Sequence, residues 1–319
     1  MSAQAGFSRR FIFCLIVLVV VLSACSATAY GLWRLRAERI DHQLEAAAMT
    51  ARAFENHLTQ SLNVIERSLM SLAIEGVAPA SLSQALRHAP YLRSVAVLDA
   101  EERIARSTDP RNLGIRLPRA DFRPEAARPL DVLRAGPVVS GRDFYDAGPV
   151  GASAPVVSFI PVARDVSLDD AHWMTVVASV NTDYFLNFYG AHISPEQGVV
   201  ELRGYDGRLL LSTDENALPG SLRPGDDLAS RLAATEVGQF EEQGADGRAM
   251  LTAYRASRAY PFVLSVRFDK ERVLAVWHQE ALRTATIVGA VLLVALTLAG
   301  LYFMRFERLA REREAERAR

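Results

Sequence analysis

The sequence has little of what many enzymes, zinc proteins and nucleic-acid binders require. Its two cysteines, Cys14 and Cys25, both fall in the first apolar run, so the rest of the chain offers neither a disulfide nor a thiolate metal site. Lysine occurs once, at Lys270. The 36 basic residues are balanced by 37 acidic ones, and the chain therefore lacks the surplus of positive charge that binding to phosphate needs. We expect no nucleic-acid partner.

Catalytic motifs are missing from the sequence as well. It contains no Gly-rich phosphate loop, no Gly-x-Ser-x-Gly elbow and no His-Glu-x-x-His pair, and its six histidines are scattered. The acidic pairs at 169–170 and 226–227 are more typical of solvated loops than of a cation site. We predict that the chain is not an enzyme and uses no cofactor and no metal ion.

Two long charge-free runs are present instead. Residues 11–33 and 284–304 carry no charge, and at about 1.5 Å per residue each run reaches across a hydrocarbon core of roughly 30 Å. Arginines crowd the segment after the second run, and Arg9 and Arg10 precede the first. Because positive charge favours the cytoplasmic side, both ends are predicted to face the cytoplasm.

The predicted protein crosses the bacterial inner membrane twice. Residues 34–283 then face the periplasm, residues 1–10 form a cytoplasmic N-terminus, and residues 305–319 begin a cytoplasmic signalling helix. A rival interpretation is a lipoprotein signal, because the tetrapeptide that ends at Cys25 resembles a lipidation site. Against it, the apolar run continues as far as Trp33, and a second span makes a lipid anchor redundant.

A long amphipathic helix is predicted within residues 34–90, a segment that also includes a connector. Its apolar positions are separated mostly by steps of four and three, with one additional step of four between Leu58 and Leu62. Packing against the chain's own domain and pairing with a second protomer explain such a stripe equally well. The apolar positions are Leu35, Ile40, Leu44, Ala47, Ala51, Phe54, Leu58, Leu62, Ile65, Leu69 and Leu72.

The remainder of the middle segment predicts two copies of one unit. Strands at 94–98 and 103–108 form one hairpin, and strands at 199–203 and 208–213 form another around an Asp-Gly turn. Their returning strands match at an offset of 105 residues, which indicates an internal duplication. Three further strands are expected in each copy, at 137–140, 155–162 and 173–180, and at 239–243, 249–254 and 262–268. The fold class is therefore α+β, with two tandem PAS-like modules whose sheets are antiparallel.

This arrangement resembles the double Cache family of bacterial extracytoplasmic sensors, which occur in histidine kinases, diguanylate cyclases and chemoreceptors. The resemblance covers residues 40–279 and is carried by the segments 155–165, 176–189 and 206–210. It implies a membrane-distal module at 91–195 that holds a ligand and a membrane-proximal module at 196–275. The proximal module would relay to the second span, within residues 276–304. The resemblance also implies a homodimer and a kinase or cyclase output domain in a longer natural protein.

The resemblance further suggests ligand-binding residues. Amino-acid-binding members carry an arginine before an aromatic pair, as in Arg142, Phe144 and Tyr145, and an acidic residue at the end of a later strand. Asn181 stands where that acid is expected, with Asp183 close by. An arginine suits a carboxylate, so the expected ligand is a carboxylate or an amino-acid-like molecule. The other candidates are Ser158, Arg164, Asp165 and Trp173.

Some of these candidates are explained equally well by a purely structural role. Arg142 fits a surface-loop arginine beside core aromatics, and Arg164 with Asp165 fits a local ion pair where a loop begins. The function predicted overall is small-molecule sensing outside the cell with signalling across the membrane. The alternative is a membrane-anchored periplasmic binding or assembly protein that grips a polypeptide partner without signalling.

Overall fold

The computed structural model describes residues 2–118, 132–148, 157–167, 173–194, 196–222, 228–244 and 247–317. The chain divides into two compact units. One is Gln43–Lys270, and the other combines Met1–His42 with Glu271–Arg319.

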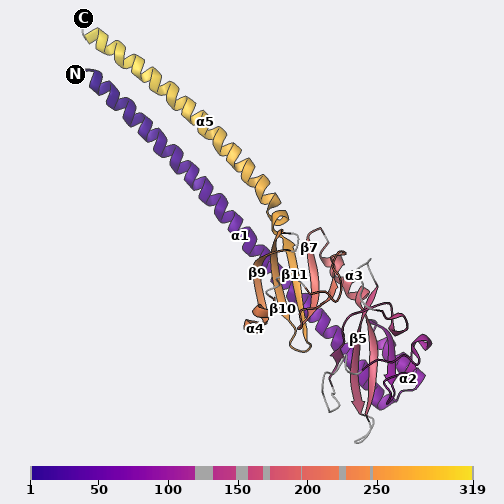
Figure 1. Cartoon of the computed structure of the whole chain (residues 1–319). Helices are drawn as coiled ribbons and strands as arrows, with labels where there is room; N and C mark the ends of the chain where they lie inside the picture. The colour runs from indigo at the N-terminus through magenta and orange to yellow at the C-terminus, as the bar shows by residue number, and fades with distance from the viewer. Residues whose placement is uncertain are drawn as a thin grey trace. The chain divides into compact units, whose positions relative to one another are not determined.

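Two long helices supply the second of these units. Helix α1 runs over Ser2–Glu75 and helix α5 over Lys270–Arg317 (Figure 1). Each contains a stretch long and apolar enough to cross a membrane, within Phe11–Glu75 and Lys270–Leu309, and no part of either apolar window is buried. These stretches coincide with the runs expected from the sequence. Two candidate transmembrane helices therefore flank the unit Gln43–Lys270.

The first sheet of that unit has the strand order β2-β1-β6-β5-β3, and β4 also pairs with β5. All its pairings are antiparallel. The expected strand at 137–140 is shorter than predicted, because two-residue strands β3 and β4 form there on either side of Pro137. The strands are β1 Leu92–Leu98, β2 Ile104–Ser107, β3 Arg134–Ala135, β4 Val139–Ser140, β5 Ser158–Ser167 and β6 Trp173–Asn181.

The second sheet has the order β8-β7-β11-β10-β9, which repeats the order of the first. Figure 1 shows β7, β9, β10 and β11 along one stretch of α1 and β5 of the first sheet along another. The α+β fold with two antiparallel sheets is confirmed. The strands are β7 Gly198–Gly204, β8 Leu209–Ser212, β9 Val237–Gln243, β10 Ala249–Ala256 and β11 Phe262–Asp269.

Equivalent hydrogen bonds confirm the duplication at an offset of 105 residues. The Val95 N–H donates to Thr108 Oγ1 at 3.0 Å, and the Val200 N–H donates to Thr213 Oγ1 at 2.9 Å. The loops that follow each hairpin also correspond, because Arg103 donates to the carbonyl of Gly114 and Arg208 to that of Gly220. Residues of the two sheets can therefore be compared position by position.

The apolar stripe of α1 packs against the chain itself. Its side chains join one core with the inner faces of both sheets, which include Val95 of β1, Val180 of β6 and Val266 of β11. Packing within one chain is therefore the correct interpretation of the stripe between Ala47 and Leu72. The buried stripe consists of Ala47, Ala51, Phe54, Leu58, Leu62, Ile65, Leu69 and Leu72.

Short helices connect the strands. Helix α2 begins with proline at its first position, where a missing N–H costs no hydrogen bond, and it lies in the predicted connector after the long helix. Helix α3 follows β6 directly and is capped by the Asn181 side chain. The short helices are α2 Pro79–His88, α3 Thr182–His192 and α4 Leu228–Ala234, with 3-10 turns η1 Pro110–Asn112 and η3 Phe144–Asp146.

Candidate functional site

A β-bulge in strand β1 places an arginine at the centre of the predicted site residues. The register between β1 and β6 shifts between Leu92 and Ser94, so Arg93 is the extra residue on its strand. A bulge re-aims the side chain that it carries. Only 16% of the Arg93 side chain is exposed.

Arg93 joins four of the predicted residues. Its Nε donates to Asn181 Oδ1 at 3.0 Å, and its Nη2 donates to an Asp183 carboxylate oxygen at 2.7 Å. Its Nη1 donates to the backbone carbonyls of Arg142 at 2.8 Å and Ser158 at 3.2 Å. One guanidinium therefore ties the start of β5, the end of β6, the start of α3 and the loop after β4.

These contacts involve two residues of the predicted site, Asn181 and Asp183. Asn181 is the N-cap of α3, and its side-chain oxygen accepts the Asp183 N–H at 3.2 Å. Asp183 forms an ion pair with Arg93 through Oδ2, and 50% of its side chain is exposed. A role for Asp183 in holding a ligand's ammonium group stays a prediction.

A hydrogen-bonded turn carries three of the predicted residues, Arg142, Phe144 and Tyr145. Asp146 Oδ1 accepts the N–H groups of Arg142 and Asp143, each at 2.9 Å, and the Asp143 carboxylate accepts the Phe144 N–H at 2.8 Å. Phe144 is buried, the Arg142 side chain is exposed, and Tyr145 is half-buried. The Phe144 ring packs edge-on against Phe159 of β5, so Phe144 belongs to a core and not to an open wall.

Beneath this turn lies a buried polar network. Asp143, of which 4% is exposed, accepts the Ser94 hydroxyl proton at 2.7 Å, and Asn112 Nδ2 donates to Ser94 Oγ at 3.2 Å. Asn112 Oδ1 in turn accepts the Tyr145 N–H at 2.9 Å. The turn is thus fixed from below to β1 and to η1, and its backbone cannot shift without breaking bonds to buried groups.

One polar group on the same face of the first sheet has no partner. Ser179 of β6 lies opposite Ser94 of β1 in the register, and both serines are fully buried. Ser179 Oγ forms no hydrogen bond, whereas Ser94 Oγ bonds to Asp143. A buried hydroxyl without a partner loses its hydration and gains nothing in return, so Ser179 calls for an explanation.

The matching face of the second sheet is filled by charged side chains. Glu201, Arg203 and Arg267 are each 5% exposed or less. Glu201 accepts from Arg203 Nη2 at 3.1 Å and also pairs with Arg267. By the offset and the strand registers, these three positions correspond to Ala96, Leu98 and Ser179 of the first sheet. The first sheet therefore carries smaller, largely apolar side chains where the second carries an ion cluster.

The remaining predicted residues lie elsewhere. Arg164 and Asp165 are neighbours within β5, not at the start of a loop, and neighbours on a strand point to opposite faces. The expected local ion pair between them is therefore wrong. Arg164 pairs with Glu66 of α1, and Asp165 accepts the Thr175 hydroxyl proton at 2.7 Å. Trp173 is the first residue of β6, and 46% of it is exposed.

Glu66 connects both sheets to α1. Besides Arg164 it accepts the Leu133 N–H at 3.1 Å. Its second oxygen shares the Tyr260 hydroxyl proton with Asn63 Oδ1, at 2.9 Å and 2.8 Å from the Tyr260 oxygen. Leu133 precedes β3 of the first sheet, and Tyr260 precedes β11 of the second. Burial, followed by the hydrogen bond to Glu66, raises the pKa of Tyr260, so its hydroxyl stays a donor at neutral pH.

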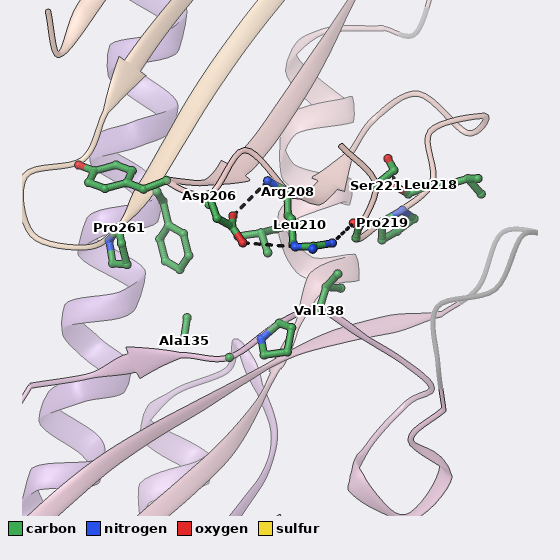
Figure 2. Close-up of a pocket in the computed structure, with 15 residues that line it drawn as sticks. Ala135, Val138, Asp206, Arg208, Leu210, Leu218, Pro219, Ser221 and Pro261 are labelled. Atoms are coloured by element: carbon green, nitrogen blue, oxygen red, sulfur yellow. Dashed lines mark hydrogen bonds and ion pairs between the residues drawn. The ribbon is translucent and has the colours of Figure 1, made fainter. Parts of the chain in front are cut away.

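A cavity of about 750 Å³ lies between the two sheets (Figure 2). The segment around Val138 supplies one wall, and the β7–β8 hairpin with the residues before β11 supplies the other. Figure 2 shows Asp206 and Arg208 side by side in the second wall. The lining residues are Ala135, Gly136, Pro137, Val138, Gly204, Tyr205, Asp206, Arg208, Leu210, Leu218, Pro219, Gly220, Ser221, Pro261 and Phe262.

Within the described part of the chain, no three His, Cys, Asp or Glu side chains are grouped so that they could hold a metal ion. His57 lies on α1 and stacks on Phe188 of α3, with ring centroids 3.9 Å apart. Burial, followed by the charge of His192, lowers the pKa of His57. His172 and the acidic pairs at 169–170 and 226–227 lie outside the described residues.

The fold is similar to solved sensor domains of receptors. The extracellular domain of the histidine kinase rpHK1S-Z16 matches with a TM-score of 0.60 at 20% identity, over 73% of this chain and 97% of that one. An extracellular ligand-binding receptor from Desulfohalobium retbaense matches with a TM-score of 0.50 at 13% identity, over 70% of this chain and 40% of that one. This chain has the fold of an extracellular sensor domain. No protein-family model and no curated protein matches the sequence.

The fold confirms the resemblance to a Cache-type sensor region. Sequence reasoning nevertheless missed three residues that organise the site. Arg93 had a visible signal, because it is a lone cation at the start of the apolar run of β1. Glu66 and Ser179 gave no comparable signal, because the first is one of many acidic residues on a helix and the second one of several serines in strands.

Proposed function

We propose that the chain senses a small molecule outside the cell and passes the signal through its two candidate spans. The observation that carries this proposal is the sensor-domain fold, which covers nearly the whole of a histidine kinase extracellular domain and lies between two apolar helices. That fold does not favour the alternative of an assembly protein. The periplasmic position of residues 34–283 and the inner membrane as the site of the spans belong to the same proposal.

The proposed ligand site is the face of the first sheet that carries Ser94 and Ser179. Its side chains are smaller than their counterparts in the second sheet, where Arg267 and Glu201 fill the equivalent positions. The hydroxyl of Ser179, which has no hydrogen-bond partner among the described residues, supplies a group that a guest can bind. The membrane-distal module at 91–195 is accordingly the ligand-binding one in this proposal.

A carboxylate is the proposed recognition group of the ligand. The exposed guanidinium of Arg142 extends from a turn that hydrogen bonds hold in place, and such a group binds carboxylates in a bidentate manner. Phe144 and Asp143 support the turn, and Tyr145 stands beside Arg142 on it. The proposed partner for the ammonium group of an amino-acid-like ligand is Asp183, which pairs with Arg93 through one oxygen while 50% of its side chain is exposed.

A thermal-shift screen of the full chain in detergent tests this proposal, with amino acids, carboxylates and amines as probes. We expect a carboxylate-bearing probe to raise the melting temperature, and Arg142→Gln to weaken its binding by tenfold or more. Arg87→Gln, which changes an exposed arginine on α2, is the matched control and should bind as the wild type does. Stable co-purification of a polypeptide, together with no response to any probe, would instead support the assembly protein.

A homodimer is also part of the proposal. The stripe between Ala47 and Leu72 is covered by the chain's own sheets, so pairing has to use other apolar positions. Leu35, of which 53% is exposed, and the half-buried Ile40 continue the same stripe toward the first span. Light scattering of the full chain in detergent measures its mass, and charged substitutions at Leu35 and Ile40 should shift that mass from dimer to monomer.

A further inference from the structure

The cavity between the sheets has mainly apolar walls and one pair of charged side chains, Asp206 and Arg208. Val138 and Pro137 face it from the first sheet, and Leu210 and Phe262 from the second. Among the lining residues that the structure describes, Arg208 is the sole cation. A mainly apolar pocket of roughly 300–1,000 Å³ with few polar groups is the usual shape of a small-molecule site.

Arg208 is held in place at the wall of this cavity. Its Nη1 donates to the Gly220 carbonyl at 3.2 Å, and its Nε lies 3.6 Å from an Asp206 carboxylate oxygen. Asp206 also accepts the Arg208 N–H at 3.1 Å, so the two residues are tied by backbone and side chain (Figure 2). A guanidinium has five N–H donors, and these contacts leave enough of them for a guest carboxylate.

The charges of Asp206 and Arg208 together favour a ligand with a single negative charge. Asp206 offsets the positive charge of Arg208, so the wall is close to neutral as a whole. A multiply charged anion such as phosphate would be repelled by Asp206, whereas one carboxylate can bind to the outer side of Arg208. The apolar walls then accommodate the remainder of the molecule, because burial of apolar surface is favourable.

Both walls of the cavity are attached to one residue of α1. Leu133, two residues before the lining residue Ala135, donates its N–H to Glu66. Tyr260, immediately before the lining residue Pro261, donates its hydroxyl proton to the other oxygen of Glu66. A guest that changes the spacing of the walls therefore acts on these two hydrogen bonds to Glu66 and on the helix that carries it.

We propose that this cavity is a second ligand site, specific for a small amphipathic monocarboxylate, and that its occupancy is transmitted to α1 through Glu66. The site is separate from the proposed ligand face of the first sheet and does not depend on which molecule binds there. Arg208 binds the carboxylate, and the surface made by Val138, Leu210 and Phe262 binds the apolar part.

Calorimetric titration of the full chain in detergent tests the binding, with hexanoate and phenylacetate as probes. We expect both carboxylates to bind, and hexanamide, hexanol and inorganic phosphate to bind at least tenfold more weakly. Arg208→Gln should reduce the affinity for hexanoate at least tenfold. Leu218→Trp, which fills the cavity from a position that is 42% exposed, should abolish binding while the protein stays folded.

The duplication supplies the matched control. Arg103 occupies the position of Arg208 in the first hairpin and donates to the Gly114 carbonyl at 2.9 Å, but it lines no part of this cavity. Arg103→Gln should therefore leave hexanoate affinity within twofold of the wild type. An equal loss of hexanoate affinity in Arg103→Gln and Arg208→Gln would overturn the site. So would the absence of binding by both carboxylates at about 10 mM.

Hydrogen exchange tests the connection to α1. Saturation with hexanoate should slow exchange in the helix around Asn63 and Glu66, and Tyr260→Phe should abolish this effect while affinity changes less than threefold. The variant removes a donor to Glu66 without touching a lining side chain. Binding with an unchanged exchange pattern in the wild type, or an unchanged response in Tyr260→Phe, would overturn the coupling.

Discussion

Two buried serines, Ser94 and Ser179, face each other across β1 and β6 and differ in their hydrogen bonds. Ser179→Ala removes a hydroxyl without a partner, so we expect the unliganded protein to gain about 1 kcal/mol of unfolding free energy. Ser94→Ala leaves the buried Asp143 carboxylate with one donor fewer and should cost about 1–3 kcal/mol. Urea unfolding of the two variants measures both, and equal effects of the same sign would contradict the assigned bonding.

Arg93 is the residue whose loss should damage the first sheet most. Arg93→Met removes the donor to the Arg142 carbonyl and the cation paired with Asp183, and we expect a loss of about 2–4 kcal/mol in unfolding free energy. The Ser158 carbonyl keeps the Thr182 hydroxyl as a donor at 2.6 Å. Arg93→Lys keeps the charge but not the planar fork, so it should rescue less than half of this loss. The exposed Arg87 is the control, and Arg87→Met should change stability by less than about 0.5 kcal/mol. Equal stability of Arg93→Met and Arg87→Met would refute this role.

The half-buried imidazole of His57 makes the fold sensitive to acid. Its pKa is lowered by burial in the folded state, so the unfolded chain takes up the proton first. The associated stability is present above a pH of about 6.5 and is lost as the pH falls from that value toward the lower pKa of the folded state. Unfolding curves between pH 8 and 5 should show this slope, and His57→Phe should reduce it. The exposed His88 is the control, because His88→Gln should keep the slope.

For single residues, the sequence indicated which polar side chains belong to the region of interest but not which partners they contact. The resemblance singled out Asn181 and Asp183, but the sequence cannot show that a bulge turns Arg93 toward them. Arg164 was paired with its neighbour Asp165 because proximity in sequence was the available guide, whereas the pleat of β5 directs it to Glu66 of α1. Interactions over ninety residues or more of chain, such as Arg164 with Glu66, depend on tertiary packing.

At the scale of the secondary-structure elements, the two duplicated modules differ most clearly in the turns of their first hairpins. Gly207 has a φ of +80°, and Glu102, which lies 105 residues earlier, has a φ of +64°. A side chain with a Cβ in this left-handed region costs about 1–2 kcal/mol. Glu102→Gly should therefore stabilise the protein by about 1 kcal/mol, and Gly207→Ala should destabilise it by a similar amount. Thermal unfolding of both variants measures these effects. A lower melting temperature for Glu102→Gly together with a higher one for Gly207→Ala would contradict the assigned backbone conformation.

The periodic elements were the most predictable part of the molecule. The steps of four and three located the buried stripe of α1, and both hairpins formed where alternating apolar residues met turn residues. The strand predicted at 137–140 was less well defined, since Pro137 has no N–H to pair and only two residues, Val139 and Ser140, join β4. The local sequence pattern thus predicted which helices and strands exist and in what order. The exact strand pairing depends on irregular backbone that the pattern does not show.

For the whole molecule, duplication followed by divergence explains why the two sheets differ. The same strand order occurs twice, yet the second sheet fills one face with Glu201, Arg203 and Arg267 and the first does not. A buried ion cluster of this kind makes that face a fixed structural element, because removal of any member leaves an uncompensated charge. The first sheet lacks such a cluster, which is why the proposal places the ligand on its face, and Glu66 of α1 contacts segments of both sheets.

The proposed function requires that the unit Gln43–Lys270 lies outside the cytoplasm. This is most directly tested by labelling single cysteines with a membrane-impermeant maleimide in spheroplasts, after Cys14 and Cys25 have been replaced by serine. Arg258, whose side chain is 84% exposed, marks the second sheet, and the exposed Glu312 marks the end of α5. We predict that Arg258→Cys is labelled in intact spheroplasts and that Glu312→Cys is labelled only after lysis. Labelling of Arg258→Cys only after lysis would contradict the account.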